Sequence, residues 1–217
     1  MINQLIIKGF KSFVDKSINF NQLNVLTGLN SSGKSTVIQA LQILNKYSRH
    51  FENPLIEGHG DYKELQNPFS SLPFSINAKY GEHGIICYSP QKENNIHTEE
   101  FPDLIIISAD RYGPLVSIPL LSDCELGSKG ENVIKCIQVH ENDILGKLIT
   151  HPNSEGDTFL YNLRAWLGTI TPGVQFNYDI IDKADTSFSL FNGYRAKNVG
   201  FGLSYTCLLY TSPSPRD

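Results

Sequence analysis

A glycine-rich segment at residues 28–35 constrains this chain more than any other part of its sequence. It reads Gly-Leu-Asn-Ser-Ser-Gly-Lys-Ser and matches the pattern GxxxxGK followed by Ser or Thr. The apolar segment Leu23–Thr27 precedes it, and apolar residues recur at helical spacing through Ser35–Tyr47 after it. Because glycines let the backbone curl tightly, several N–H groups can converge on one anion where the helix begins. The sequence therefore predicts a strand, a phosphate-binding loop and a helix in succession.

Two side chains at the end of this loop have chemistry that suits a nucleoside phosphate. Lys34 carries a mobile positive charge for the β- and γ-phosphates, and the hydroxyl of Ser35 is placed to bind Mg²⁺. The motif by itself does not distinguish an ATPase from a GTPase or a kinase. The sequence has no Asn-Lys-x-Asp segment of the kind that recognises guanine, which argues against a GTPase.

The composition is that of an ordinary globular protein and excludes some classes. The 217 residues are 40% hydrophobic and 18% charged, with a formal net charge of −4, so the chain as a whole is not a basic nucleic-acid binder. No apolar stretch is long enough to cross a membrane. The four cysteines have no CxxC spacing and the six histidines no metal-binding spacing. We expect a cytoplasmic protein with no membrane contact.

The rest of the chain has the pattern of an α/β protein. The imperfect alternation of Leu5–Phe20 predicts two short strands with a turn at Asp15–Ser17. The continuous apolar run Leu104–Ser108 predicts a strand buried on both faces. Periodicity further predicts two helices and three strands, at Glu131–Leu148, Phe159–Leu167, Ile85–Tyr88, Val174–Tyr178 and Ser187–Leu190.

The residues that lead into the loop resemble one group of ATPases. Ile6–Phe13 and Asn24–Thr36 are similar to the N-terminal head of RecF, SMC and OLD-type proteins, which are ABC-type ATPases. The resemblance implies that ATP and Mg²⁺ are the ligands and that the Lys-Ser-Phe segment lies near the nucleotide. The residues implied to contact nucleotide are Lys11, Ser12, Phe13, Gly28, Asn30, Ser31, Ser32, Gly33, Lys34, Ser35 and Thr36. From the residues alone, Lys11–Phe13 can also be an ordinary turn beside the core.

Three later segments resemble one branch of that group, the bacterial AAA-type ABC ATPases with a C-terminal domain of unknown function. They are Ile107–Pro114, Leu126–Asn132 and Asn198–Tyr205. The resemblance implies that the third is a signature motif, which reaches the γ-phosphate held by a partner head. Its expected contacts are Gly200, Gly202 and Ser204. From the residues alone this stretch can also be a glycine-rich turn that ends a hairpin.

Arg111 has two open interpretations. It follows the apolar run and lies shortly before a Gly-Pro pair, so it can contact nucleotide or lie where the chain leaves the first lobe. The other interpretation is a structural pair with Asp110 or another carboxylate. No residue is assigned a catalytic role, because the strand ending in Asp-Glu that ABC-type ATPases place after the signature does not occur before Thr206.

The resemblance implies an α/β P-loop NTPase fold, an ABC-ATPase-like head with N-terminal strands and a truncated second lobe. We expect the P-loop lobe at 1–114 and the incomplete second lobe at 115–206. It also implies ATP binding, and hydrolysis in the full-length protein, coupled to DNA maintenance or phage defence. The implied partners are a second head, bound through ATP, and DNA, a nuclease or another effector. The alternatives are an ATP-sensing regulatory subunit that does not touch DNA, or a P-loop kinase.

The last eleven residues, 207–217, match a translated sequencing adapter. We therefore expect the natural reading frame to continue past Thr206. We also expect this piece to bind nucleotide weakly at best and to hydrolyse it negligibly. We also expect residues 207–217 to make no contact with the core. The other interpretation of this stretch is a Ser/Pro-rich disordered tail.

Overall fold

The computed structural model describes residues 1–49, 53–91, 95–120, 126–200, 202–204 and 206–207. The chain forms two compact units, Met1–Leu104 and Ile105–Asp217. Each unit packs helices on an antiparallel sheet, so the fold is mixed α/β as the sequence predicts. This division of the chain falls between Leu104 and Ile105, and the lobe boundary expected after residue 114 stays a prediction.

Five antiparallel strands form the sheet of the first unit, in the order β2-β1-β3-β4-β5. Strand β1 lies between two neighbours and alternates as a half-buried strand does: Leu5 and Ile7 are fully buried, whereas Lys8 is exposed. The strand expected at Ile85–Tyr88 is confirmed as β4. The strands are β1 (Ile2–Phe10), β2 (Phe13–Asn19), β3 (Ser75–Tyr80), β4 (Gly84–Tyr88) and β5 (Ile96–His97).

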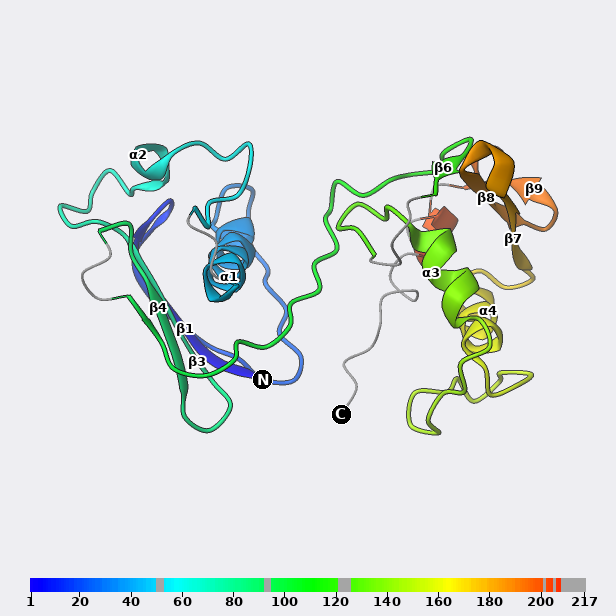
Figure 1. Cartoon of the computed structure of the whole chain (residues 1–217), viewed down its shortest axis with the longest axis horizontal. Helices are drawn as coiled ribbons and strands as arrows, with labels where there is room; N and C mark the ends of the chain where they lie inside the picture. The colour runs from blue at the N-terminus through cyan, green and yellow to red at the C-terminus, as the bar shows by residue number, and fades with distance from the viewer. Residues whose placement is uncertain (50–52, 92–94, 121–125, 201, 205, 208–217) are drawn as a thin grey trace. The chain divides into compact units, whose positions relative to one another are not determined.

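Helix α1 (Lys34–Ser48) lies along one face of this sheet (Figure 1). Its buried apolar residues recur every three or four positions and form one stripe, which packs with the strands in a single hydrophobic cluster. The stripe consists of Val37, Ala40, Ile43 and Leu44. The helix expected at Ser35–Tyr47 is confirmed to within a residue at each end. A short helix, α2 (Tyr62–Leu65), is capped by Asp61, whose side chain accepts hydrogen bonds from the N–H groups of Lys63 and Glu64.

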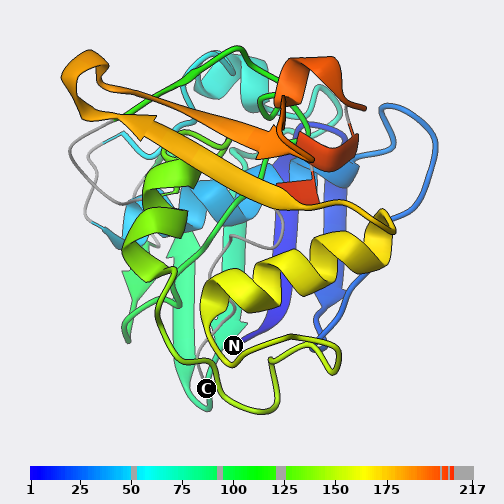
Figure 2. The same cartoon turned by 90° about the vertical axis from the view of Figure 1, so that its right-hand side faces the viewer.

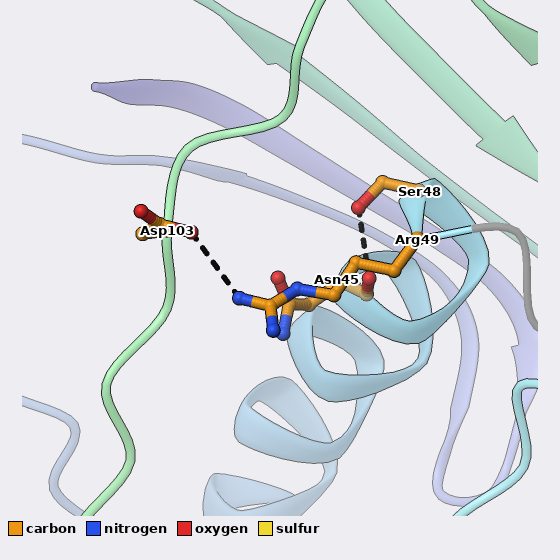
Figure 3. A network of polar contacts seen from close by, with 4 residues as sticks. All are labelled: Asn45, Ser48, Arg49 and Asp103. Atoms are coloured by element: carbon orange, nitrogen blue, oxygen red, sulfur yellow. Dashed lines mark hydrogen bonds and ion pairs between the residues drawn. The ribbon is translucent and has the colours of Figure 1, made fainter. Parts of the chain in front are cut away.

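Two polar contacts accompany the end of α1 (Figure 3). The Ser48 hydroxyl donates a hydrogen bond of 2.8 Å to the carbonyl of Asn45. The Arg49 guanidinium forms an ion pair with Asp103 at 3.2 Å, and the two side chains are 56% and 93% exposed. Such an exposed pair contributes at most about 1 kcal/mol, so the apolar stripe of α1 holds the helix in place.

The second unit has a smaller antiparallel sheet, in the order β6-β8-β7 with β9 paired to β8. Helices α3 and α4 lie together against one side of β7 and β8 (Figure 2). Its core joins residues of α3 and α4 to Phe176 and Phe191 of the sheet. The elements are β6 (Ile118–Pro119), α3 (Val133–His140), α4 (Phe159–Ile170), β7 (Phe176–Ile181), β8 (Thr186–Phe191) and β9 (Tyr194–Arg195), with 3₁₀ turns at Asp182–Ala184 and Ala196–Asn198.

The first hairpin turns earlier than the sequence analysis expected. The strands pair with Phe10 opposite Phe13, so the turn consists of Lys11 and Ser12, whereas Asp15–Ser17 lies within β2 and pairs with β1. The expected turn was wrong because β2 is an edge strand with mostly exposed side chains. A polar triplet in such a strand has the composition of a turn yet pairs normally.

The strand expected at Leu23–Thr27 is wrong for this structure. This segment is irregular, and Leu23 and Val25 are 81% and 74% exposed. A strand needs a neighbour to complete its hydrogen-bond ladder. Among the residues that the structure describes, no strand pairs with this segment, so its hydrophobic pattern alone does not produce a strand.

Two further expectations in the middle of the chain are corrected. Leu104–Ser108 forms no strand and is not fully buried; Ile105 is 50% exposed, and the Ser108 N–H donates to the Ser128 carbonyl. The helix expected at Glu131–Leu148 is only α3. Beyond it, the Leu145 N–H bonds to the Asp157 carbonyl, so the backbone pairs with another segment and leaves the helix.

The remaining expected elements of the second unit are confirmed with shifted ends, as α4, β7 and β8. The expectation for the last residues fails at its first position. Cys207 is 3% exposed and belongs to the hydrophobic cluster of the second unit. Residues 208–217 lie outside the described residues.

Candidate functional site

The glycine-rich loop folds back on itself before α1 begins. Gly28, Ser31 and Gly33 all have positive φ angles, of 146°, 63° and 95°. The Ser32 N–H donates to the Leu29 carbonyl at 3.3 Å and closes a turn within the loop. The two glycines supply conformations that side chains disfavour, and the chain enters the helix at Lys34, one residue before the expected start.

The side chain of Lys34 lies over the loop. Its ammonium Nζ donates to the carbonyls of Gly28 at 2.7 Å and Leu29 at 2.6 Å. The first turn of α1 contains no acidic residue, and Gly33 provides no side-chain cap. Because the first N–H groups of a helix have no partner within it, this end is positive both by charge and by dipole. The loop is thus suited to an anion.

The hydroxyl side chains of the loop divide into two sets. Ser31, Ser32 and Ser35 are exposed, and so is Asn30 with its side-chain amide. Ser35 in the first helical turn can therefore meet a cation carried by a phosphate ligand. Thr36 is 7% exposed and packs into the first unit, so only its backbone N–H is left to contact a ligand.

The hairpin turn between β1 and β2 packs against the loop. A Cβ atom built on Gly33 would lie 2.6 Å from Cζ of Phe13 and 2.8 Å from the hydroxyl of Ser12. The Lys11 Nζ donates to the Gln39 side chain of α1 at 2.7 Å, and burial lowers the pKa of Lys11. The structure therefore brings Lys11, Ser12 and Phe13 to the loop. Their contact with a nucleotide stays a prediction.

The segment expected to be the signature opens a short helical stretch over 202–204 and 206–207. Gly200 and Gly202 are exposed, and the Thr206 hydroxyl donates to the Gly202 carbonyl at 2.7 Å. The Ser204 hydroxyl is buried and has no hydrogen-bond partner among the described residues. It borders a cavity of about 20 Å³, large enough for one water molecule. Ser204 therefore points inward, and a contact with a partner's phosphate requires it to turn outward.

The three later segments identified in the sequence converge in the second unit, which sequence reasoning did not foresee. The N–H of Tyr112 donates to the Lys129 carbonyl at 2.7 Å. Asp110 pairs with Lys129 at 3.1 Å and raises its pKa. The cavity beside Ser204 is lined by Tyr112 and Gly130, one from each of the other segments. No periodicity or spacing signals these contacts, because they join residues far apart in the chain.

Arg111 donates to the Ser108 carbonyl at 3.2 Å, whereas Asp110 is engaged by Lys129.

The described residues lack two other kinds of site. They contain no group of three His, Cys, Asp or Glu residues that could hold a metal ion. Over the same residues, no helix combines the length and apolar character needed to cross a membrane.

The contact between Gly33 and the hairpin turn generates a first prediction. Gly33→Ala should lower the free energy of unfolding by about 2–4 kcal/mol, through a disfavoured φ angle and a clash with Phe13. Gly58→Ala is the matched control: its φ is also positive, at 77°, but its Cβ would meet nothing within 4 Å. Urea unfolding followed by circular dichroism gives both values. Equal losses in the two variants would show that the Phe13 ring does not press on the loop.

Comparisons with known proteins bear on this site. A family model described as the AAA ATPase domain matches residues 1–171. One similar solved structure is the recombination mediator protein RecF with ATP in the RecFOR pathway, at 12% identity and a TM-score of 0.44, covering 97% of this chain and 78% of that chain. A second, RecF with ATPrS, has 12% identity and a TM-score of 0.48, covering 97% and 79%. A comparison with curated proteins gives no match. From the match over residues 1–171, the chain belongs to the AAA ATPase domain family.

Proposed function

We propose that this chain binds ATP together with Mg²⁺ at residues 28–36, as the head of an ABC-type ATPase. The observation that carries the proposal is the position of Lys34. Its ammonium lies on two carbonyls of the glycine-rich loop, at 2.7 and 2.6 Å, directly beside the positive end of α1. Membership of the AAA ATPase domain family supports ATP as the ligand.

The loop residues have distinct roles in this proposal. The N–H groups of the loop and of the first turn of α1 surround the phosphates. Lys34 leaves its two carbonyl partners and places its charge on the β- and γ-phosphates. The exposed Ser35 hydroxyl contributes one ligand to Mg²⁺. Such a site fits Mg²⁺, which keeps several waters and takes few protein ligands when phosphates bind it.

The phosphate loop accounts for binding and orientation rather than for hydrolysis. Bound Mg²⁺ supplies charge neutralisation to the phosphate oxygens. The chain's own residues hold the β- and γ-phosphates in a fixed direction, which is the part of phosphoryl transfer that positioning provides. No residue is assigned to the activation of water.

We further propose how two heads assemble and which process their ATP serves. Two resemblances support a homodimer closed through ATP, with work directed at DNA maintenance or phage defence. Ile6–Phe13 is similar to RecF, SMC and OLD-type heads, and Asn198–Tyr205 is similar to the bacterial AAA-type branch of that group. In this dimer, the exposed Gly200 and Gly202 face the phosphate held by the partner. Ser204 joins them after its side chain has turned out of the cavity.

ATP binding is tested by Lys34→Ala. Loss of the ammonium removes charge-assisted contacts to phosphate, so the affinity for ATP should fall by about 10- to 100-fold in isothermal titration calorimetry. Lys16→Ala is the control, because Lys16 is exposed on β2 of the same unit and changes the net charge equally. Equal affinities for the Lys34→Ala variant and the unmodified protein would contradict the assignment of this loop.

The dimer is tested by light scattering with and without Mg–ATP. The proposed arrangement predicts that the molar mass rises from that of one 24.3 kDa chain towards twice this value when ATP is added. The Lys34→Ala variant should stay monomeric, since closure depends on the bound phosphate. A mass that does not change at saturating ATP would contradict the assembly and leave ATP binding itself intact.

A further inference from the structure

Asn67 is a buried polar residue of the first unit whose contacts lead to the hairpin turn. It is 3% exposed and lies shortly after α2. Its backbone N–H donates to the Gly9 carbonyl at 2.8 Å, and its side-chain Nδ2 donates to the Lys11 carbonyl at 2.6 Å. Its Oδ1 accepts from the Phe69 N–H at 2.9 Å. Both hydrogen-bonding ends of the buried amide are therefore used, one of them on the turn.

The turn that Asn67 contacts needs to be held. Lys11 has a φ angle of 49°, in the left-handed region that residues with a side chain rarely adopt. Such a conformation persists only where the surrounding structure enforces it. Three hydrogen bonds enforce it at Lys11. The Asn67 side chain donates to the Lys11 carbonyl, and the Lys11 N–H donates to the Leu65 carbonyl at 2.8 Å. The Lys11 ammonium donates to the Gln39 side chain.

The conformation of Lys11 determines where the next two residues lie. Ser12 and Phe13 are the residues that come closest to the space beside Gly33, at 2.8 and 2.6 Å from a Cβ built there. If Lys11 relaxed to a negative φ, the direction of the chain into Ser12 and Phe13 would change. The loop would then lose the surface against which Gly33 packs, and its backbone would be free to leave the phosphate-binding conformation.

We propose that Asn67 is a positioning residue of the nucleotide site. Its buried amide holds Lys11 in the left-handed conformation, and the turn in turn keeps the loop at Gly28–Gly33 ready for phosphate. The amide acts through backbone groups and touches no ligand itself. This inference rests on the proposed binding of ATP at the loop.

The test uses Asn67→Asp in the intact chain. This substitution keeps the shape and the acceptor for the Phe69 N–H but replaces the donor that holds the Lys11 carbonyl with an acceptor. We expect the variant to fold and its affinity for ATP, measured by calorimetry on the folded protein, to fall by about tenfold or more. Wild-type affinity in a folded Asn67→Asp variant would overturn the proposal.

Asn95→Asp is the matched control. The Asn95 amide also forms hydrogen bonds with backbone groups. Its Nδ2 donates to the Ser89 carbonyl at 3.1 Å, and its Oδ1 accepts from the Ser89 N–H at 2.6 Å. It belongs to the segment between β4 and β5 of the same unit, so its loss should lower stability but leave ATP affinity unchanged. An equal loss of affinity in both variants would reduce the effect to general destabilisation and overturn the positioning role.

A second variant covers the case in which Asn67→Asp does not fold. Asn67→Ser is neutral and too short to reach the Lys11 carbonyl, and it should show the same loss of affinity. If neither variant folds, Asn67 belongs to the core of the unit, and the positioning role is overturned. If the unmodified chain itself fails to bind ATP, the proposed function fails first, which is a separate and recognisable outcome.

Discussion

The close packing of Phe13 on Gly33 joins the hairpin of β1 and β2 to the loop that precedes α1. Gly33 belongs to the loop that opens α1, and Phe13 begins the edge strand of the sheet that α1 covers. Because a Cβ on Gly33 would clash with the Phe13 ring and φ of Gly33 is 95°, the position strongly favours glycine. The loop is therefore shaped from outside, by a hairpin that is itself held by Asn67 and Gln39. The same contact explains why a Lys-Ser-Phe turn accompanies a phosphate loop in this chain.

The second unit is organised around backbone contacts between segments that the sequence shows only as separate motifs. Residues 107–114 bond to residues 126–132, and both border the cavity into which Ser204 points. Tyr112 and Gly130 line the same cavity as Ser204, so a change in the inward position of Ser204 would alter the surroundings of both residues. The unit has its own hydrophobic core.

The sequence predicts best where a pattern is local. The helix expected at Ser35–Tyr47 is confirmed as α1, and Gly28 and Gly33 adopt the positive φ angles that a tight loop requires. The binding of phosphate by this loop stays a prediction. Leu23–Thr27 fails because hydrophobicity records a tendency to form a strand and not the presence of a partner strand. Asp15–Ser17 fails because an edge strand tolerates polar residues. The hydrogen bond of Asn67 to Lys11 and the inward position of the Ser204 hydroxyl could not be predicted, since both depend on contacts between residues distant in the sequence.

Hydrogen–deuterium exchange of the intact chain, with and without Mg–ATP, tests the central claim most directly. Backbone N–H groups at residues 28–36 should exchange more slowly when ATP is present, because phosphate oxygens accept hydrogen bonds from them. The turn at Lys11–Phe13 should gain protection with them, since it packs on Gly33. Protection that is absent from residues 28–36, or found only in the second unit, would contradict the assignment of this loop as the nucleotide site.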